Sequence, residues 1–151
     1  MEKQIIYIDM DNVLVDFPSA FPYLSMETLK AYEGRLDEVP GIFSLMKPME
    51  GAIEAYRFLA KHFNVFILST APWLNPSAWS DKLLWVQKYL GDVAYKRLIL
   101  THHKDLNRGD FLIDDRKKNG ASEFQGIHIL FGSEEFKDWK SVIMYFSQNY
   151  L

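Results

Sequence analysis

The sequence contains no cysteine, which excludes disulfides and any zinc site with cysteine ligands. It also lacks a long apolar run: the apolar stretch near the N-terminus is short and ends at Asp9, which is typical of neither a signal peptide nor a membrane span. The formal net charge is only −3, and no basic stretch of the kind that binds a nucleic acid polymer is present. We therefore expect a cytoplasmic protein that binds neither nucleic acid nor membrane.

The apolar content is sufficient for one folded domain, because 48% of the 151 residues are hydrophobic and 15% are aromatic. Short runs rich in β-branched and aromatic residues predict five strands, at residues 5–8, 65–68, 98–100, 111–113 and 127–131. Apolar residues at helical spacing predict helices at residues 48–62, 76–90 and 134–148, and Asn75 is expected to cap the second one. Strands that alternate with helices indicate an α/β fold with a parallel sheet covered on both faces.

Residues 17–43 interrupt this alternation. The segment contains three prolines, and a helix is expected only at residues 26–32. We interpret the segment as a small helical cap inserted after the first strand, so that residues 1–16 and 44–151 form the core domain. A cap of this kind excludes water from an active site and selects substrates.

Polar side chains follow three of the predicted strands: Asp9, Ser69 and Asp114. Ligands of open parallel sheets bind outside the carboxyl ends of the strands, so we expect these side chains on one rim. Asp9 and Asp11 form an acid pair, in which one carboxylate could attack phosphorus while the other handles protons. The alternative is a polar strand end with a capping aspartate.

Asp114 and Asp115 form a second acid pair after a predicted strand. Adjacent acids at a buried strand end repel each other unless a cation joins them. Together with Asp9 and Asp11 they make an oxygen cluster that suits Mg²⁺. The alternative is a solvated turn in which Arg116 pairs with one of the two acids.

Hydroxyl groups and a lysine complete the set of candidate residues. Ser69 and Thr70 end the second predicted strand, and a turn there suits phosphate oxygens, the alternative being an ordinary serine–threonine turn. Lys104 follows the third strand and is placed to neutralise phosphate, the alternative being a surface lysine. We expect His102 and His103 to face solvent or lie near phosphate rather than bind a metal.

The order of these features is similar to the four-motif signature of the haloacid dehalogenase superfamily, whose members share a Rossmann-like core. Within it, the sequence resembles the 5'(3')-deoxyribonucleotidases. The resemblance covers most of the chain except the cap, and it is carried by DMDNVLVDF (9–17), FILSTAP (66–72), WSDKLLWVQKYLG (79–91), LILTHHK (98–104) and FLIDDR (111–116). It implies a phosphatase that hydrolyses a small phosphomonoester, most closely a deoxyribonucleoside or ribonucleoside monophosphate.

The resemblance also implies roles for the two acid pairs. Asp9 would be the nucleophile that forms an aspartyl-phosphate, and Asp11 would protonate the leaving oxygen and then activate water. Mg²⁺ would be held by the Asp9 carboxylate, the Asp11 backbone carbonyl and an acid of the fourth motif. We favour Asp115 as the direct ligand and Asp114 as its neighbour in the surrounding shell.

The remaining implied contacts concern the substrate. Ser69 and Thr70 would bind phosphate, and Lys104 would bridge phosphate and nucleophile. Phe17 would pack near the sugar and disfavour a 2'-hydroxyl, or else would only anchor the cap. Candidates for stacking on a base, each with core or cap packing as the alternative, are Phe21, Tyr23, Tyr32, Phe43 and Trp73.

Three readings of function follow. Besides the nucleotidase, the chain could be a phosphatase for another small metabolite such as a sugar phosphate, or a catalytically inactive ligand-binding protein. The presence of every motif residue argues against the last of these. The sequence leaves open whether the protein acts as a monomer or as a homodimer.

Overall fold

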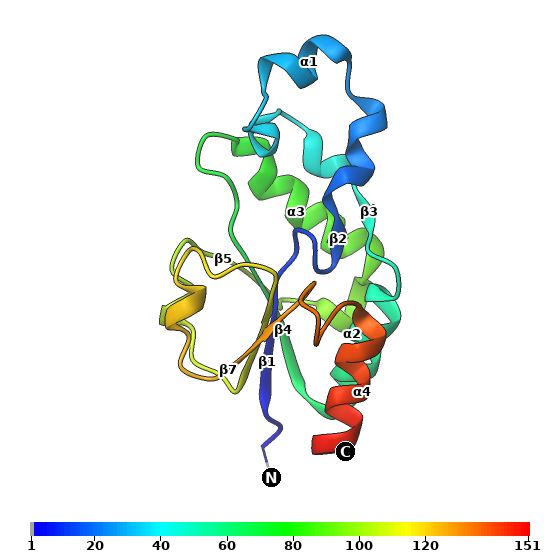
Figure 1. Ribbon diagram of the computed structural model, residues 1–151, viewed down its shortest axis with the longest axis vertical. Helices are drawn as coiled ribbons and strands as arrows, with labels where there is room; N and C mark the ends of the chain where they lie inside the picture. The colour runs from blue at the N-terminus through cyan, green and yellow to red at the C-terminus, as the bar shows by residue number, and fades with distance from the viewer. Residues whose placement is uncertain (1) are drawn as a thin grey trace.

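The computed structural model describes residues 2–151, and its centre is a five-stranded parallel sheet in the order β5-β4-β1-β6-β7 (Figure 1). The strands are β1 (Ile5–Ile8), β4 (Asn64–Ser69), β5 (Leu98–Leu100), β6 (Phe111–Asp114) and β7 (Ile127–Leu130). All four pairings are parallel. The predicted α/β class and the five predicted strands are therefore confirmed.

Three longer helices pack on this sheet: α2 (Ala52–His62), α3 (Pro76–Tyr89) and α4 (Trp139–Tyr150). Helix α4 begins five residues later than predicted, because Asp138 caps it and accepts a hydrogen bond from the backbone of Ser141. Helix α3 begins as predicted, with Asn75 at the N-cap position, but the Asn75 side chain makes no capping hydrogen bond to the helix. The Asn75 amide instead donates to the carbonyls of Asp37 and Val39.

The two faces of the sheet are covered differently. The large core cluster joins one face to α2, α3 and α4, whereas the second face packs on the loops around the 3-10 turns Lys104–Leu106 and Ala121–Glu123. Right-handed crossovers explain why the helices α2 and α3 and the short turns lie on opposite faces. The chain steps from β1 to β4 and β5 in one direction and then returns past β1 to β6 and β7, so its later connections cross the other face. Both faces are covered, as predicted, but the second by short turns.

The predicted cap insertion is present after β1. It is preceded by β2 (Val15–Asp16) and followed by β3 (Lys47–Pro48), which pair antiparallel, and it contains α1 (Met26–Ala31). Figure 1 shows it at the end of the molecule opposite both chain termini. Phe43 belongs to the same core cluster as the sheet, so the cap returns to the core before β3. The domain boundaries at residues 17 and 43 stay a prediction.

The strand order reverses at β1, because β4 and β6 flank it on opposite sides. In open α/β sheets, such a switch point leaves a crevice at the carboxyl ends of the strands, where ligands bind. Asp9 directly follows β1 and therefore lies at this crevice. Across residues 2–151, no helix has the length and apolarity needed to cross a bilayer.

Candidate active site

A tight turn after β1 positions the first acid pair. The backbone N–H of Asp9 still follows the sheet and donates to the carbonyl of Ile113 at 2.9 Å. Asn12 then adopts a left-handed conformation (φ 59°), which asparagine tolerates better than most residues. The carbonyl of Met10 accepts from the three backbone N–H groups of residues 13–15. The turn thus brings Asp9 and Asp11 to the wall of one cavity, which a regular strand would not do.

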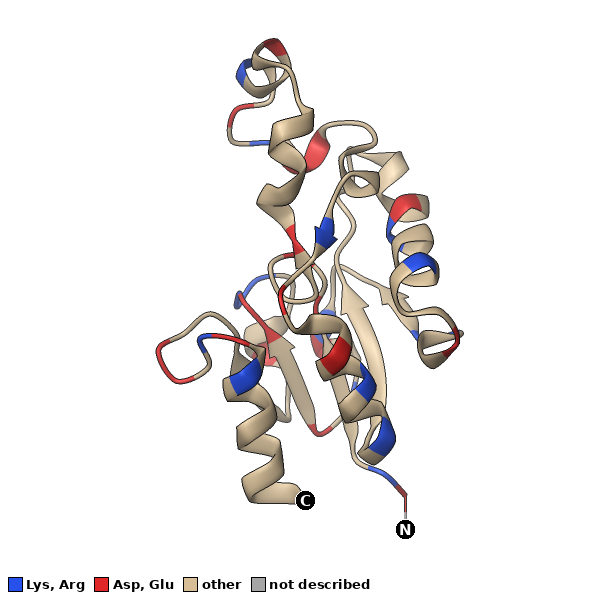
Figure 2. Ribbon diagram, turned by 90° about the vertical axis from the view of Figure 1, so that its right-hand side faces the viewer, with Lys and Arg blue, Asp and Glu red and all other residues tan. Residues whose placement is uncertain are grey.

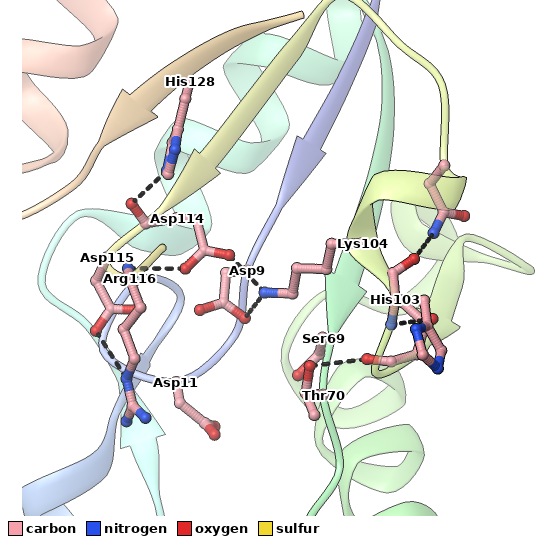
Figure 3. A network of polar contacts seen from close by, with 12 residues as sticks. Asp9, Asp11, Ser69, Thr70, His103, Lys104, Asp114, Asp115, Arg116 and His128 are labelled. Atoms are coloured by element: carbon pink, nitrogen blue, oxygen red, sulfur yellow. Dashed lines mark hydrogen bonds and ion pairs between the residues drawn. The ribbon is translucent and has the colours of Figure 1, made fainter. Parts of the chain in front are cut away.

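Lys104 joins the two acid pairs. Its ammonium nitrogen lies 3.1 Å from Oδ1 of Asp9 and 2.5 Å from Oδ2 of Asp114, and the residue is only 4% exposed (Figure 3). Burial on its own would lower the pKa of Lys104, but the carboxylates of Asp9 and Asp114 raise it above its ordinary value. Lys104 is therefore a buried cation in contact with both acid pairs, and not the surface lysine of the alternative interpretation.

Asp115 is the acid of the site that has a buried carboxylate oxygen without a hydrogen-bond partner among the described residues. Its Oδ1 is buried and has no hydrogen-bond partner, while Oδ2 lies 3.9 Å from the exposed Arg116 side chain. Burial, followed by the negative charge of Asp9, raises the pKa of Asp115 to about 7. By contrast, Asp114 already accepts from Lys104 and, through Oδ1, from the backbone of Arg116 at 3.0 Å.

The carboxylates form a group that suits a divalent cation. Asp9, Asp114 and Asp115 each place one oxygen so that the three atoms lie within 4.8 Å of one another. An all-oxygen set is the donor chemistry of Mg²⁺, and a cation would satisfy the unpartnered Asp115 oxygen, whose burial otherwise costs free energy. The residues present therefore fit the metal that the sequence predicted.

The two hydroxyls that end β4 have different surroundings. Thr70 lines the cavity and donates its own hydroxyl to the carbonyl of Thr101 at 2.7 Å. Ser69 is fully buried behind it, and its Oγ accepts a hydrogen bond from Lys82 at 2.7 Å. Of the two predicted phosphate ligands, the structure brings Thr70 to the cavity and Ser69 to a position beneath it.

Lys82 is the residue that sequence reasoning missed. It is 0% exposed, and its ammonium lies 3.2 Å from both carboxylate oxygens of Asp11. Burial raises the pKa of Asp11, and the Lys82 charge opposes this. One signal was available: Lys82 lies four residues after Ala78 and four before Val86, on the apolar stripe of α3, where an unpaired lysine would be costly.

The cavity above these groups has a volume of about 440 Å³. Residues of the core domain line it together with four residues of the cap, which are Phe17, Gly34, Leu36 and Asp37. Phe17 is the sole aromatic residue among the described lining residues, and its ring also packs edge-on against Phe21 and Phe43. Phe17 therefore both anchors the cap and forms part of the cavity wall.

The other singled-out side chains lie outside this lining. The ring of His102 packs against Trp73 and Trp79, with 6.0 Å between ring centroids in each pair. His103 is exposed. None of the predicted base-stacking candidates belongs to the described lining residues, which are drawn from residues 2–151.

Sequence comparison decides the family. The family described as "5' nucleotidase, deoxy (Pyrimidine), cytosolic type C protein" matches residues 25–143. A protein of Vibrio phage KVP40, provisionally named a 5'(3')-deoxyribonucleotidase, is 64% identical over 144 residues, which is 95% of this chain and 85% of the relative. The chain belongs to this nucleotidase family. It is therefore a phosphatase that acts on nucleotides, as the sequence resemblance implied.

More distant relatives of the nucleotidase carry the same provisional name. One from Bordetella pertussis is 30% identical and covers 92% of this chain and 95% of its own length; one from Staphylococcus aureus is 28% identical and covers 99% and 98%. In structure, the nucleotidase shares its fold with a haloacid dehalogenase-like family hydrolase from Xanthomonas campestris, at a TM-score of 0.51, 11% identity and 97% coverage of both chains. This likeness shows the fold, which is the α/β fold that the sequence predicted.

Proposed function

We propose that the nucleotidase hydrolyses nucleoside monophosphates in two steps through an aspartyl-phosphate on Asp9, with the help of Mg²⁺. One observation carries this proposal: a buried carboxylate, Asp9, at the switch point of the sheet, held by the Lys104 ammonium and sharing a cavity with Asp11. A carboxylate held in this way is oriented for attack, and a neighbouring cation offsets the repulsion between the carboxylate and an incoming phosphate.

In the first step, an oxygen of Asp9 attacks phosphorus and the bond from phosphorus to the ester oxygen breaks. The leaving oxygen takes a proton from Asp11, and the nucleoside departs with its hydroxyl restored. In the second step, Asp11 removes a proton from a water molecule that attacks phosphorus. The bond between phosphorus and Asp9 breaks, which releases inorganic phosphate and restores both acids.

The remaining residues bind and orient. Lys104 fixes the Asp9 carboxylate and faces the phosphate oxygens, and Thr70 is the hydroxyl residue at the cavity wall. Mg²⁺ would be held by the carboxylates of Asp9 and Asp115 and the backbone carbonyl of Asp11, and would supply positive charge to the phosphate. The unpartnered oxygen of Asp115 supports this choice, since both oxygens of Asp114 already accept hydrogen bonds.

We infer that the substrate is a small deoxyribonucleotide. The relatives are named for that activity, and the Phe17 ring at the cavity wall would leave a 2'-hydroxyl without a partner. Figure 2 shows basic and acidic residues interspersed along the chain, with no continuous basic stretch, which favours a small ligand over a nucleic acid polymer. A cytoplasmic location stays a prediction from the sequence, as does the choice between monomer and homodimer.

A substrate screen tests the proposal. Phosphate release is measured for deoxyribonucleoside monophosphates, ribonucleoside monophosphates and sugar phosphates, with and without Mg²⁺, for the wild type and Asp9→Asn. We expect fastest turnover of a deoxyribonucleotide, dependence on Mg²⁺, and a loss of at least about 1,000-fold in Asp9→Asn. Best turnover of a sugar phosphate would favour the alternative substrate class, and full activity of Asp9→Asn would refute the mechanism.

A further inference from the structure

We propose that Lys82 is a positioning residue for the proton-transfer acid: it holds the Asp11 carboxylate in the orientation that reaches the leaving oxygen, and Ser69 and Phe43 hold Lys82 in turn. This inference rests on the proposed function, in which Asp11 transfers the protons.

The contacts of Lys82 define its role. Its ammonium lies 3.2 Å from each Asp11 oxygen and 2.7 Å from Oγ of Ser69, and it stands 4.6 Å from the centroid of the Phe43 ring. These partners come from three separate segments: the turn after β1, the end of β4 and the cap. Because the ammonium bridges both carboxylate oxygens, it restrains rotation of the Asp11 side chain.

Core packing alone does not account for a lysine at this position. Its neighbours on the buried face of α3 include Ala78, Trp85 and Val86, and an apolar side chain of similar length, such as methionine, would fill the same space. Burial of a lysine costs free energy unless the ammonium is paired, so packing alone would favour the apolar side chain. Within residues 2–151, however, Lys82 is the only side chain that hydrogen-bonds to the Asp11 carboxylate. Without it, the half-buried Asp11 is free to turn towards solvent.

The two buried lysines therefore have separate partners. Lys104 contacts Asp9 and Asp114, and Lys82 contacts Asp11. Phe43 also links Lys82 to the substrate-facing wall, because its ring packs on Phe17 with centroids 5.9 Å apart. The Phe43 ring thus contacts both the Lys82 ammonium and the Phe17 ring of the cavity wall. The packing of the cap on the core and the orientation of Asp11 therefore depend on the same contacts.

The chemistry of the leaving group separates positioning of Asp11 from a general structural role. A nucleoside leaves as an alcohol and needs a proton, whereas nitrophenolate leaves as a stable anion and needs none. The test compares release of nucleoside from a deoxyribonucleoside monophosphate with release of nitrophenolate from p-nitrophenyl phosphate, in single turnovers with enzyme in excess. Release of either product reports the first step, before water attacks.

The variants are Lys82→Met, Lys82→Arg and Ser69→Ala, with Lys88→Met as the matched control. Lys88 lies on the same helix, but it is exposed and its ammonium contacts only the Tyr89 ring among the interactions of the described chain. We expect Lys82→Met to slow nucleoside release about 100-fold or more, the contribution typical of a proton donor, and nitrophenolate release less than about 3-fold. Lys82→Arg should restore part of the loss, Ser69→Ala should show a smaller loss with the same preference, and Lys88→Met should behave as wild type.

Two outcomes overturn the inference: equal slowing of both substrates by Lys82→Met, or no slowing of either. If Lys82→Met does not fold, as judged by its thermal melting curve, Ser69→Ala decides by the same comparison. Failure of the proposed function would look different, because Asp9→Asn would then release product from both substrates at the wild-type rate.

Discussion

At the scale of single residues, the site is short of positive charge. Four carboxylates, Asp9, Asp11, Asp114 and Asp115, face two buried ammonium groups, those of Lys82 and Lys104. Burial and the charge of Asp9 accordingly raise the pKa of Asp114 to about 6 and that of Asp115 to about 7. Such a site either retains protons or binds a cation, which makes proton binding and metal binding compete.

This competition predicts the pH dependence of stability. The pKa of Asp115 is about 7 in the folded protein, above its ordinary value of 3.8, so the folded state holds more protons than the unfolded state between these values. The free energy of unfolding of the metal-free protein should therefore fall as pH rises from about 4 to about 7. Because Mg²⁺ binds the deprotonated acids, it should raise the melting temperature more at pH 8 than at pH 5.

Thermal melts with and without Mg²⁺ at both pH values check this expectation. Asp115→Asn should flatten both the pH dependence and the effect of Mg²⁺. Asp92→Asn is the matched control, since Asp92 is exposed in the loop after α3 and should change neither. An equal rise in melting temperature at pH 5 and pH 8 would contradict the assignment of Asp115 to the metal.

At the scale of elements, the start of α3 fastens the cap to the core. Asn75 is 1% exposed, and its Nδ2 donates to the carbonyls of Asp37 and Val39 at 2.9 and 3.0 Å. Its Oδ1 accepts from Ser77, whose Oγ also accepts from the backbone of Gly41. The helix start was predictable from Asn75-Pro76, but the partners of the amide were not, because they lie in and just after the short 3-10 turn Leu36–Glu38 of the cap.

Asn75→Ala should therefore loosen the cap. It removes the side-chain donor to the carbonyls of Asp37 and Val39, although the Val39 carbonyl still accepts from the backbone of Ile42, so we expect a loss of about 1–3 kcal/mol in the free energy of unfolding measured by urea denaturation. Hydrogen exchange should rise over residues 36–43 before it rises in the sheet. Ser80→Ala, which removes an exposed hydroxyl of the same helix, is the control. Unchanged exchange over residues 36–43 would contradict this role of Asn75.

At the scale of the whole molecule, alternation of strands and helices was enough to predict the sheet and the rim on which Asp9, Thr70, Lys104 and Asp114 meet. Each of these residues ends a strand or follows one closely in the sequence, so its placement depends on local sequence. Lys82 could not be placed in the same way. Its position depends on Asp11, Ser69 and Phe43, which are far apart in sequence and meet only when the cap packs on α3.

The cover of the second face of the sheet was likewise not predictable from the sequence. The connections from β5 to β6 and from β6 to β7 contain only 3-10 turns, so no helical pattern marks them. Yet the connection from β6 to β7 supports Lys104, whose backbone N–H donates to the carbonyl of Asn119 at 2.8 Å. A Cβ at Gly120 would lie 2.9 Å from the Lys104 backbone nitrogen, which explains a glycine there.

The central claim is that Asp9 becomes phosphorylated during turnover, and acid quenching of the reaction tests it most directly. The wild type is mixed with a deoxyribonucleoside monophosphate and Mg²⁺, quenched, and reduced with borohydride, which converts an aspartyl-phosphate to homoserine. Mass spectrometry of the peptides should find homoserine at position 9, only with substrate and Mg²⁺, and none in Asp9→Asn. Turnover without modification at position 9, or with modification of another residue, would contradict the account.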